Sequence, residues 1–265
     1  MYKNKFKVLV FIFIFTLTSF LFHAPAFWSD SARAQSLNDL MIMTENYPPF
    51  NFSKDDILQG IAVDLMEAML KKAGSDKTRK DIQLLPWARG YHYLQNEKNA
   101  CLFATTRTDE RDKLFKWVGP ISDTTIVLTS RKDRKVSIKT TDDLKKYKIG
   151  AVIKDIGEQL LLDAGLDPKN IDSTGGTNAV LKSIKKMNLG RMDAFAYEES
   201  VLKWELKQQG FDVNQYETVY VLKSGELYYA FNSNTSDEII QKLQQALDDL
   251  KKTDEYQKIK DPYLK

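Results

Sequence analysis

Cysteine and histidine are scarce in this sequence. Its 265 residues include one cysteine and two histidines, and only Cys101 and His92 lie beyond the N-terminal segment discussed below. A structural zinc site takes four such ligands, and a disulfide within the chain needs two cysteines. A Ser-His-Asp triad would depend on His92 alone, and no nucleophile-elbow sequence accompanies it. We therefore expect no metal, no other cofactor and no catalytic residue.

Glycine and proline are also few, and neither sign of charge dominates. The 12 Gly and 7 Pro show no collagen-like or low-complexity bias. The chain carries 39 Lys and Arg against 36 Asp and Glu, and residues 1–34 hold four of the basic and one of the acidic residues, so 35 of each sign remain beyond them. A nucleic-acid partner would require a basic face that displaces counterions, so we expect no such partner.

The N-terminal segment has the three parts of a secretory signal peptide. Three lysines lie within residues 1–7, the run Val8–Phe22 is almost wholly apolar, and Ala32-Arg33-Ala34 places small residues at a cleavage site before Gln35. An uncleaved membrane anchor is the alternative, but this run of about 15 residues is shorter than the ~20 that a spanning helix needs. We predict a signal peptide over residues 1–34 and an exported, soluble product in which Cys101 is buried.

Beyond residue 35, apolar runs typical of buried strands alternate with amphipathic patterns typical of helices. We predict strands at 40–43, 82–85, 100–105, 149–153, 194–197, 220–222 and 227–231. We predict helices at 61–73, 91–96, 142–146, 157–164, 179–187, 200–208 and 236–252. Strands that alternate with helices favour the α/β class with a parallel sheet. The β-branched run at 125–129 could leave a first domain for a second, so we expect two α/β lobes of about 100 residues each.

Short motifs along the chain occur in a characteristic order. They are Tyr47-Pro48-Pro49-Phe50-Asn51-Phe52 with Gly60–Leu65, Thr108–Arg111 with Phe115–Pro120, Asp142–Lys145 with Lys148–Val152, Gly190–Phe195, and Asp254–Ile259. Each motif alone is weak, but together they cover nearly all of the chain beyond the leader. With these motifs in this order, the sequence resembles the family-3 periplasmic solute-binding proteins of polar amino-acid ABC transporters.

The resemblance implies a type II periplasmic binding fold, in which two lobes are joined by two crossing strands with the ligand cleft between them. The first lobe would comprise residues 36–124 and 229–265, and the second would comprise residues 125–228. Ligand would bind between the lobes and shift the population toward a closed form.

The resemblance also implies how the first lobe would hold a ligand carboxylate. Arg111 matches the family arginine that binds this group, and a planar guanidinium suits bidentate pairing with a carboxylate. A surface arginine in a charged loop is the alternative. Thr106 matches a hydroxyl position that assists the same carboxylate, and Arg107 is a further basic residue near it.

Two aromatic residues match the walls of the family's ligand site. Tyr47 matches one wall, and Trp87 lies near the second. If the segment were extended, Arg89 would lie on the same side as Trp87, because residues two apart share a face of a strand. A core tyrosine and a structural indole packed under an arginine are the alternatives.

The second lobe departs from the family pattern. Asp155 stands where the family has a Gly-Thr-Thr-like turn that donates to the ligand carboxylate, and a helix cap is its alternative role. Glu198 occupies the position of the family aspartate that pairs with the α-amino group. Three arginines facing these two carboxylates favour a zwitterionic or polar ligand.

The function implied is that of a monomeric, periplasmic, non-enzymatic receptor for an amino acid or related small polar solute. It would deliver this solute to the membrane permease of an ABC importer. Two alternatives remain open at this point: a sensing module for a membrane receptor, and a cyclohexadienyl-dehydratase-like enzyme on the same scaffold, with Glu198 as general acid.

Export generates the first prediction. Mass analysis of the protein recovered from its native host should give a chain that begins at Gln35, because signal peptidase cleaves after small residues such as Ala34. Recovery of the full-length chain in the membrane fraction would instead support the uncleaved anchor.

Overall fold

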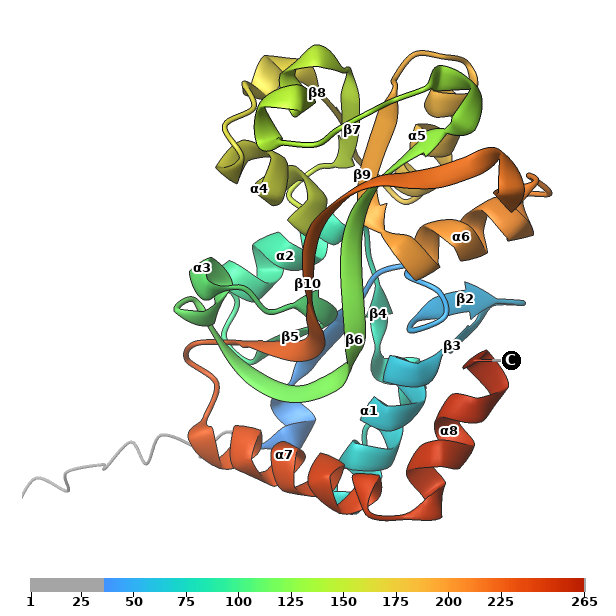
Figure 1. The fold of residues 1–265 in the computed structure, drawn as a ribbon. Helices are drawn as coiled ribbons and strands as arrows, with labels where there is room; N and C mark the ends of the chain where they lie inside the picture. The colour runs from blue at the N-terminus through green and yellow to red at the C-terminus, as the bar shows by residue number, and fades with distance from the viewer. Residues whose placement is uncertain (1–35, 265) are drawn as a thin grey trace, which may run out of the picture. The chain divides into compact units, whose positions relative to one another are not determined.

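The computed structural model describes residues 36–264, so the leader expected at 1–34 lies outside the described residues. These residues form one mixed sheet of eight strands, in the order β4-β1-β5-β10-β6-β9-β7-β8, with helices on both faces, and a separate hairpin (Figure 1). Within residues 36–264, no helix combines the length and the apolar character needed to cross a bilayer.

One end of the sheet belongs to what we call the first lobe. Its strands are β1 (Met41–Thr44), β4 (Gln83–Leu84) and β5 (Ala100–Thr106), and β1 pairs in parallel with both others. Its helices are α1 (Ile61–Lys72), α2 (Trp87–Asn96), α3 (Asp109–Asp112), α7 (Asp237–Lys251) and α8 (Asp254–Leu264). The hairpin β2 (Phe52–Lys54) and β3 (Ile57–Gln59) lies between β1 and α1 in the chain. Cys101 is fully buried in β5 as a free thiol, as predicted.

The other end of the sheet belongs to the second lobe. Its parallel strands are β7 (Ile149–Val152), β8 (Ile171–Thr174) and β9 (Ala194–Glu198). Its helices are α4 (Ile156–Asp163), α5 (Ala179–Asn188) and α6 (Glu199–Gln208). The predicted helices and strands of this lobe agree with the structure to within about two residues, the usual spread at element ends. Strand β8 was not predicted.

Two strands of 17 residues join the lobes. They are β6 (Phe115–Arg131) and β10 (Tyr216–Asn232), which run antiparallel to each other from one lobe into the other (Figure 1). In the first lobe β10 pairs with β5, and in the second lobe β6 pairs with β9. The sequence predicted only the β-branched part of β6 and divided β10 in two, because their middle parts are half-exposed and lack a buried apolar run.

Helix α2 begins four residues earlier than predicted, at Trp87. The segment from Trp87 to Arg89 is therefore helical, and the extended segment considered above is wrong. Gly90 lies inside this helix. A side chain there would bring a Cβ to 3.0 Å from Leu102, so glycine allows α2 to pack closely on β5.

The largest apolar core spans both lobes. It buries one face of α1 and α7 against the first-lobe strands and continues through Tyr47 to Tyr197 and the apolar side of α6. Smaller cores lie under α2 in the first lobe and under α4 in the second. The rings of Tyr47 and Tyr197 meet edge to face at 5.6 Å, so the lobes are in contact across the core.

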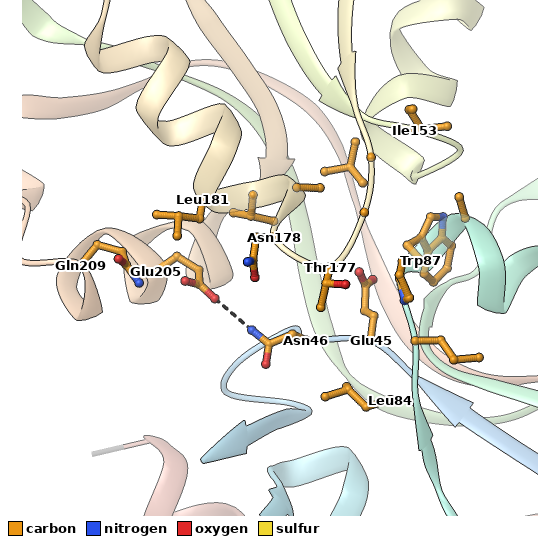
Figure 2. A pocket seen from close by; sticks show the side chains of 18 residues that line it. Glu45, Asn46, Leu84, Trp87, Ile153, Thr177, Asn178, Leu181, Glu205 and Gln209 are labelled. Atoms are coloured by element: carbon orange, nitrogen blue, oxygen red, sulfur yellow. Dashed lines mark hydrogen bonds between the residues drawn. The ribbon is translucent and has the colours of Figure 1, made fainter. Parts of the chain in front are cut away.

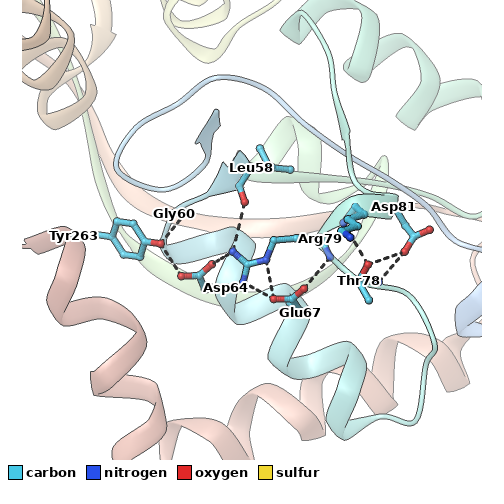
Figure 3. Close-up of polar contacts among 9 residues, drawn as sticks. Leu58, Gly60, Asp64, Glu67, Thr78, Arg79, Asp81 and Tyr263 are labelled. Atoms are coloured by element: carbon cyan, nitrogen blue, oxygen red, sulfur yellow. Dashed lines mark hydrogen bonds and ion pairs between the residues drawn. The ribbon is translucent and has the colours of Figure 1, made fainter. Parts of the chain in front are cut away.

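A polar network attaches α8 to the first lobe (Figure 3). Tyr263 donates a hydrogen bond to Asp64 Oδ2 at 2.7 Å and accepts one from the Gly60 backbone N–H at 3.2 Å. Arg79 pairs with Asp64 at 3.1 Å and also with Glu67. Burial raises the pKa of Asp64, while the bonds from Tyr263 and Arg79 oppose that rise.

Loss of the Tyr263 hydroxyl should destabilise the fold. Tyr263→Phe removes two hydrogen bonds, each worth about 1 kcal/mol, so Tm should fall by roughly 4–8 °C in thermal unfolding followed by circular dichroism. Tyr256→Phe is the matched control, because its hydroxyl lies 3.5 Å from the Ile121 carbonyl and should contribute little. Equal effects of the two changes would contradict this account of the network.

Candidate functional site

A cavity of about 160 Å³ lies between the lobes (Figure 2). We call it the inner cavity. At about 10–15 Å³ for each water, it has space for on the order of ten water molecules. From the first lobe it is lined by Glu45, Asn46 and residues 84–88, and from the second lobe by residues 152–153, residues 175–181, Glu205 and Gln209.

The ends of the parallel strands place these residues together. Glu45 follows β1, Leu85 follows β4, Ile153 follows β7 and Gly175 follows β8. In open α/β sheets, ligands bind in the crevice outside the carboxyl ends of the strands. The inner cavity therefore occupies the position in which this class of sheet binds small molecules.

Four charged side chains lie near Tyr47 and the inner cavity. Three carboxylates interact electrostatically with the Tyr47 hydroxyl, and one guanidinium interacts with two of these carboxylates. We call Glu45, Arg111, Asp155 and Glu198 the charged cluster. Arg111, Asp155 and Glu198 are each exposed by 5% or less, and Glu45 is partly buried and lines the cavity. Three carboxylates thus accompany one guanidinium in a region of low solvent exposure.

Arg111 is held by aromatic rings and one carbonyl. It lies in the short helix α3, and its guanidinium carbon is 5.5 Å from the ring centre of Trp87 and 5.3 Å from that of Tyr91. Its Nη1 donates to the Thr106 carbonyl at 3.3 Å. Its Nε is buried and has no hydrogen-bond partner among the described residues. A buried donor of this kind calls for an explanation, and a ligand carboxylate would supply one.

Asp155 faces the cluster from the second lobe at the N-cap position of α4. The first turn of α4 packs closely on β9. A Cβ on Gly157 would lie only 2.6 Å from the Ala196 carbonyl oxygen, so glycine allows this close approach. Burial raises the pKa of Asp155, while Arg111 and the first amides of α4 oppose that rise. Its Oδ2 has no partner among the described residues.

Glu198 closes β9 and caps α6. Its Oε2 accepts hydrogen bonds from the Ser200 hydroxyl and the Val201 backbone N–H, both at 2.7 Å. Burial raises the pKa of Glu198, and these two bonds oppose that rise. The predicted ligand residue therefore also has a structural role that the sequence reasoning did not assign.

Glu45 is the member of the cluster that the sequence reasoning missed. Burial, reinforced by the Asp155 carboxylate, raises the pKa of Glu45 well above its usual range, and Arg111 acts in the opposite direction. The Asn51 side chain donates to the Glu45 carbonyl at 2.8 Å, which holds the loop after β1 in place. A carboxylate directly after a buried strand, two residues before Tyr47, was the available signal.

The predicted aromatic residues lie at this site. Tyr47 is buried and packs on Tyr197, whose hydroxyl has no partner among the described residues. Trp87 lines the inner cavity, and its indole N–H donates to the Lys154 carbonyl of the second lobe at 2.7 Å. Trp87 thus serves as a wall of the cavity, a platform for Arg111 and a bridge between the lobes.

Two predicted residues lie apart from the charged cluster. Arg89 is exposed on α2, and its Nε donates to the Tyr93 hydroxyl at 3.3 Å. Residues two apart on a helix point in different directions, so Arg89 does not lie on the same side as Trp87. Arg107 pairs with Asp112 and lies over the rings of Trp117 and Tyr228. Thr106 is buried beside Arg111, but the contact it makes there is through its main-chain carbonyl.

The chemistry available is that of binding polar and charged groups. Arg111 can pair with a carboxylate, and the three acidic side chains can pair with ammonium or guanidinium groups. Within residues 36–264, no group of three or more His, Cys, Asp and Glu side chains is placed to hold a metal ion.

Comparison with known proteins agrees with this geometry. The model of the bacterial extracellular solute-binding proteins, family 3, matches residues 40–265. In Bacillus subtilis, the sequence is 26% identical to the "Probable amino-acid-binding protein YxeM" over 218 residues, which is 82% of this chain and 80% of that protein. It is 24% identical to the "Arginine-binding extracellular protein ArtP" over 245 residues, which is 90% of this chain and 91% of the relative.

A solved structure is similar over nearly the same extent. An ancestral arginine-binding protein bound to arginine has a TM-score of 0.69 and 26% identity, over 85% of this chain and 98% of the other. These similarities confirm the two-lobed α/β fold expected from the sequence.

Neutralising Glu45 should stabilise the protein when no solute is added. The raised pKa means that the folded state binds more protons than the unfolded state, so stability falls as pH rises from the ordinary Glu range through the raised pKa. Glu45→Gln should therefore raise Tm at neutral pH, by roughly 2–4 °C for each 1 kcal/mol gained. The difference from the parent should shrink at acid pH, where Glu45 itself becomes neutral.

Thermal unfolding at several pH values measures this difference. Glu97→Gln, an exposed carboxylate at the end of α2, is the matched control and should leave Tm unchanged. A Glu45→Gln protein that melts at or below the parent temperature at neutral pH would contradict a strained buried carboxylate.

Proposed function

Since the chain belongs to family 3 of the bacterial extracellular solute-binding proteins, we propose that it is a periplasmic receptor for a cationic amino acid. It releases this solute to the membrane permease of an ABC importer. It acts as a monomer and catalyses no reaction. The named relatives are binding proteins, which favours a receptor over the dehydratase-like enzyme.

The observation that carries this proposal is the composition of the charged cluster. One buried guanidinium is accompanied by three carboxylates, and buried charges are costly unless they are paired. An amino acid with a cationic side chain brings one carboxylate and two positive groups. Its carboxylate pairs with Arg111, and its two positive groups offset the acidic excess. A neutral amino acid would leave more of that excess uncompensated.

Capture requires the lobes to open and close. We place the lobe boundaries within β6 and β10, so that residues 36–124 with 229–265 form the first lobe and residues 125–228 form the second. The hydrogen bonds from Trp87 to Lys154 and from Asn46 to Glu205 connect the lobes and would break on opening. Ligand contacts made only in the closed arrangement then shift the population toward it.

Isothermal titration with L-arginine, L-lysine and L-histidine, and with the neutral L-glutamine for comparison, tests the proposal. Hydrogen bonds to a charged group are worth about 1.5–3 kcal/mol each, so Arg111→Ala should weaken binding at least about tenfold. Arg89→Ala is the matched control, because Arg89 is exposed and apart from the cluster, and it should bind as the parent does. Glu198→Gln should also weaken binding of a cationic amino acid, since it removes a charge and retains the shape.

Each variant should first be shown to melt close to the parent temperature, so that a folding defect is not read as lost binding. Unchanged affinity in Arg111→Ala would remove the carboxylate anchor from the proposal. Tighter binding of neutral than of cationic amino acids would contradict the charge argument.

A further inference from the structure

A second hollow lies next to the inner cavity and is larger. It has a volume of about 520 Å³ and is formed by the β2–β3 hairpin, the end of α8 and one side of α6. We call it the outer groove. Small-molecule sites typically have volumes of about 300–1,000 Å³. The outer groove is therefore large enough for an amino acid, and both lobes contribute to it.

Three aromatic side chains form one wall of the outer groove. The Phe52 ring centre lies 5.7 Å from that of Trp204, with 48° between the planes, and 6.2 Å from that of Tyr263, with 88° between the planes. All three residues are only partly buried and line the groove. Aromatic faces set at different angles suit the aliphatic stem of a side chain and attract a cationic end group.

Two opposite charges lie along the same groove. Glu205 is partly buried on α6, and burial raises its pKa. Lys54 is exposed at the end of β2 and makes no ion pair with a described residue. These are the two charged residues among those that line the outer groove. A zwitterion complements this pair, with its ammonium group on Glu205 and its carboxylate on Lys54.

The outer groove and the inner cavity share a wall. Asn46 and Glu205 line both, and Asn46 Nδ2 donates to Glu205 Oε1 at 3.3 Å (Figure 2). This distance is at the long end for an N–H···O bond, so the bond is weak. An ammonium group in the outer groove would compete with Asn46 for the same carboxylate.

We propose that the outer groove is a second, weaker site for a zwitterionic amino acid, which binds there between Lys54 and Glu205 against the aromatic wall before it enters the inner cavity. The identity of the ligand rests on the proposed function. The existence of the site rests on the groove, its aromatic wall and its two charges.

Fluorine NMR of the protein labelled with 5-fluorotryptophan can follow the two sites separately, because Trp204 lies in the outer groove and Trp87 lines the inner cavity. Trp204→Phe and Trp87→Phe assign the two resonances. During titration with L-arginine, the two resonances should shift with different midpoints, and that of Trp204 should lie at the higher concentration.

Matched variants separate the sites. Lys54→Ala should raise the Trp204 midpoint at least about tenfold, as expected for loss of a charged hydrogen bond, and leave the Trp87 midpoint unchanged. Lys80→Ala, which changes an exposed lysine that does not line the groove, should alter neither midpoint. Arg111→Ala should raise the Trp87 midpoint and leave that of Trp204 within about twofold, since it does not touch the groove.

One result would overturn the second site and leave the proposed function intact. In it, both resonances share a single midpoint in the parent and in Lys54→Ala, and both lose their response in Arg111→Ala. A protein of parental Tm whose Trp87 and Trp204 resonances respond to none of L-arginine, L-lysine and L-histidine would overturn both.

Discussion

Burial of the Arg111 guanidinium between two lobes is the constraint on which the rest of the site depends. Arginine cannot be deprotonated in a protein, so its charge must be compensated where it lies. The rings of Trp87 and Tyr91 lie against it, and the Thr106 carbonyl accepts a hydrogen bond from its Nη1. The carboxylates around it then exceed what one guanidinium can neutralise. Burial raises the pKa values of Glu45, Asp155 and Glu198, and Asp155 reinforces the rise at Glu45. A cationic solute would offset the acidic excess.

The sheet explains why charges from distant parts of the sequence meet. Strands β1, β4 and β5 are parallel in one lobe, and β7, β8 and β9 are parallel in the other. Because β6 and β10 carry the chain between the lobes in opposite directions, the residues after each set of parallel strands gather at the same place. Side chains on strand ends and helix starts are held by packing on both sides. The site is therefore positioned by regular, packed elements.

Two hydrogen bonds that connect the lobes are made by side chains that also line the cavities. Trp87 lines the inner cavity and bonds to the second lobe, and the Asn46–Glu205 bond divides the inner cavity from the outer groove. A solute that disturbs either contact changes how the lobes meet. In the proposed function, binding and closure would be linked through these hydrogen bonds, each of which contributes only about 1 kcal/mol on balance. Weak links of this kind allow a small solute to shift the population of the two arrangements.

The sequence by itself determined most of the helices and strands, because apolar periodicity reports directly which face of an element is buried. The motif register also brought Arg111, Glu198, Tyr47 and Trp87 into consideration. All four are buried in the structure, and Trp87 lines the inner cavity. The sequence could not determine which strands are neighbours in the sheet, and hence which strand ends lie side by side. That order is set by pairings between residues far apart in the chain, and it alone decided that Glu45 joins the cluster. Packing of α2 on β5 likewise made the segment at Arg89 helical, which turned that side chain away from the site.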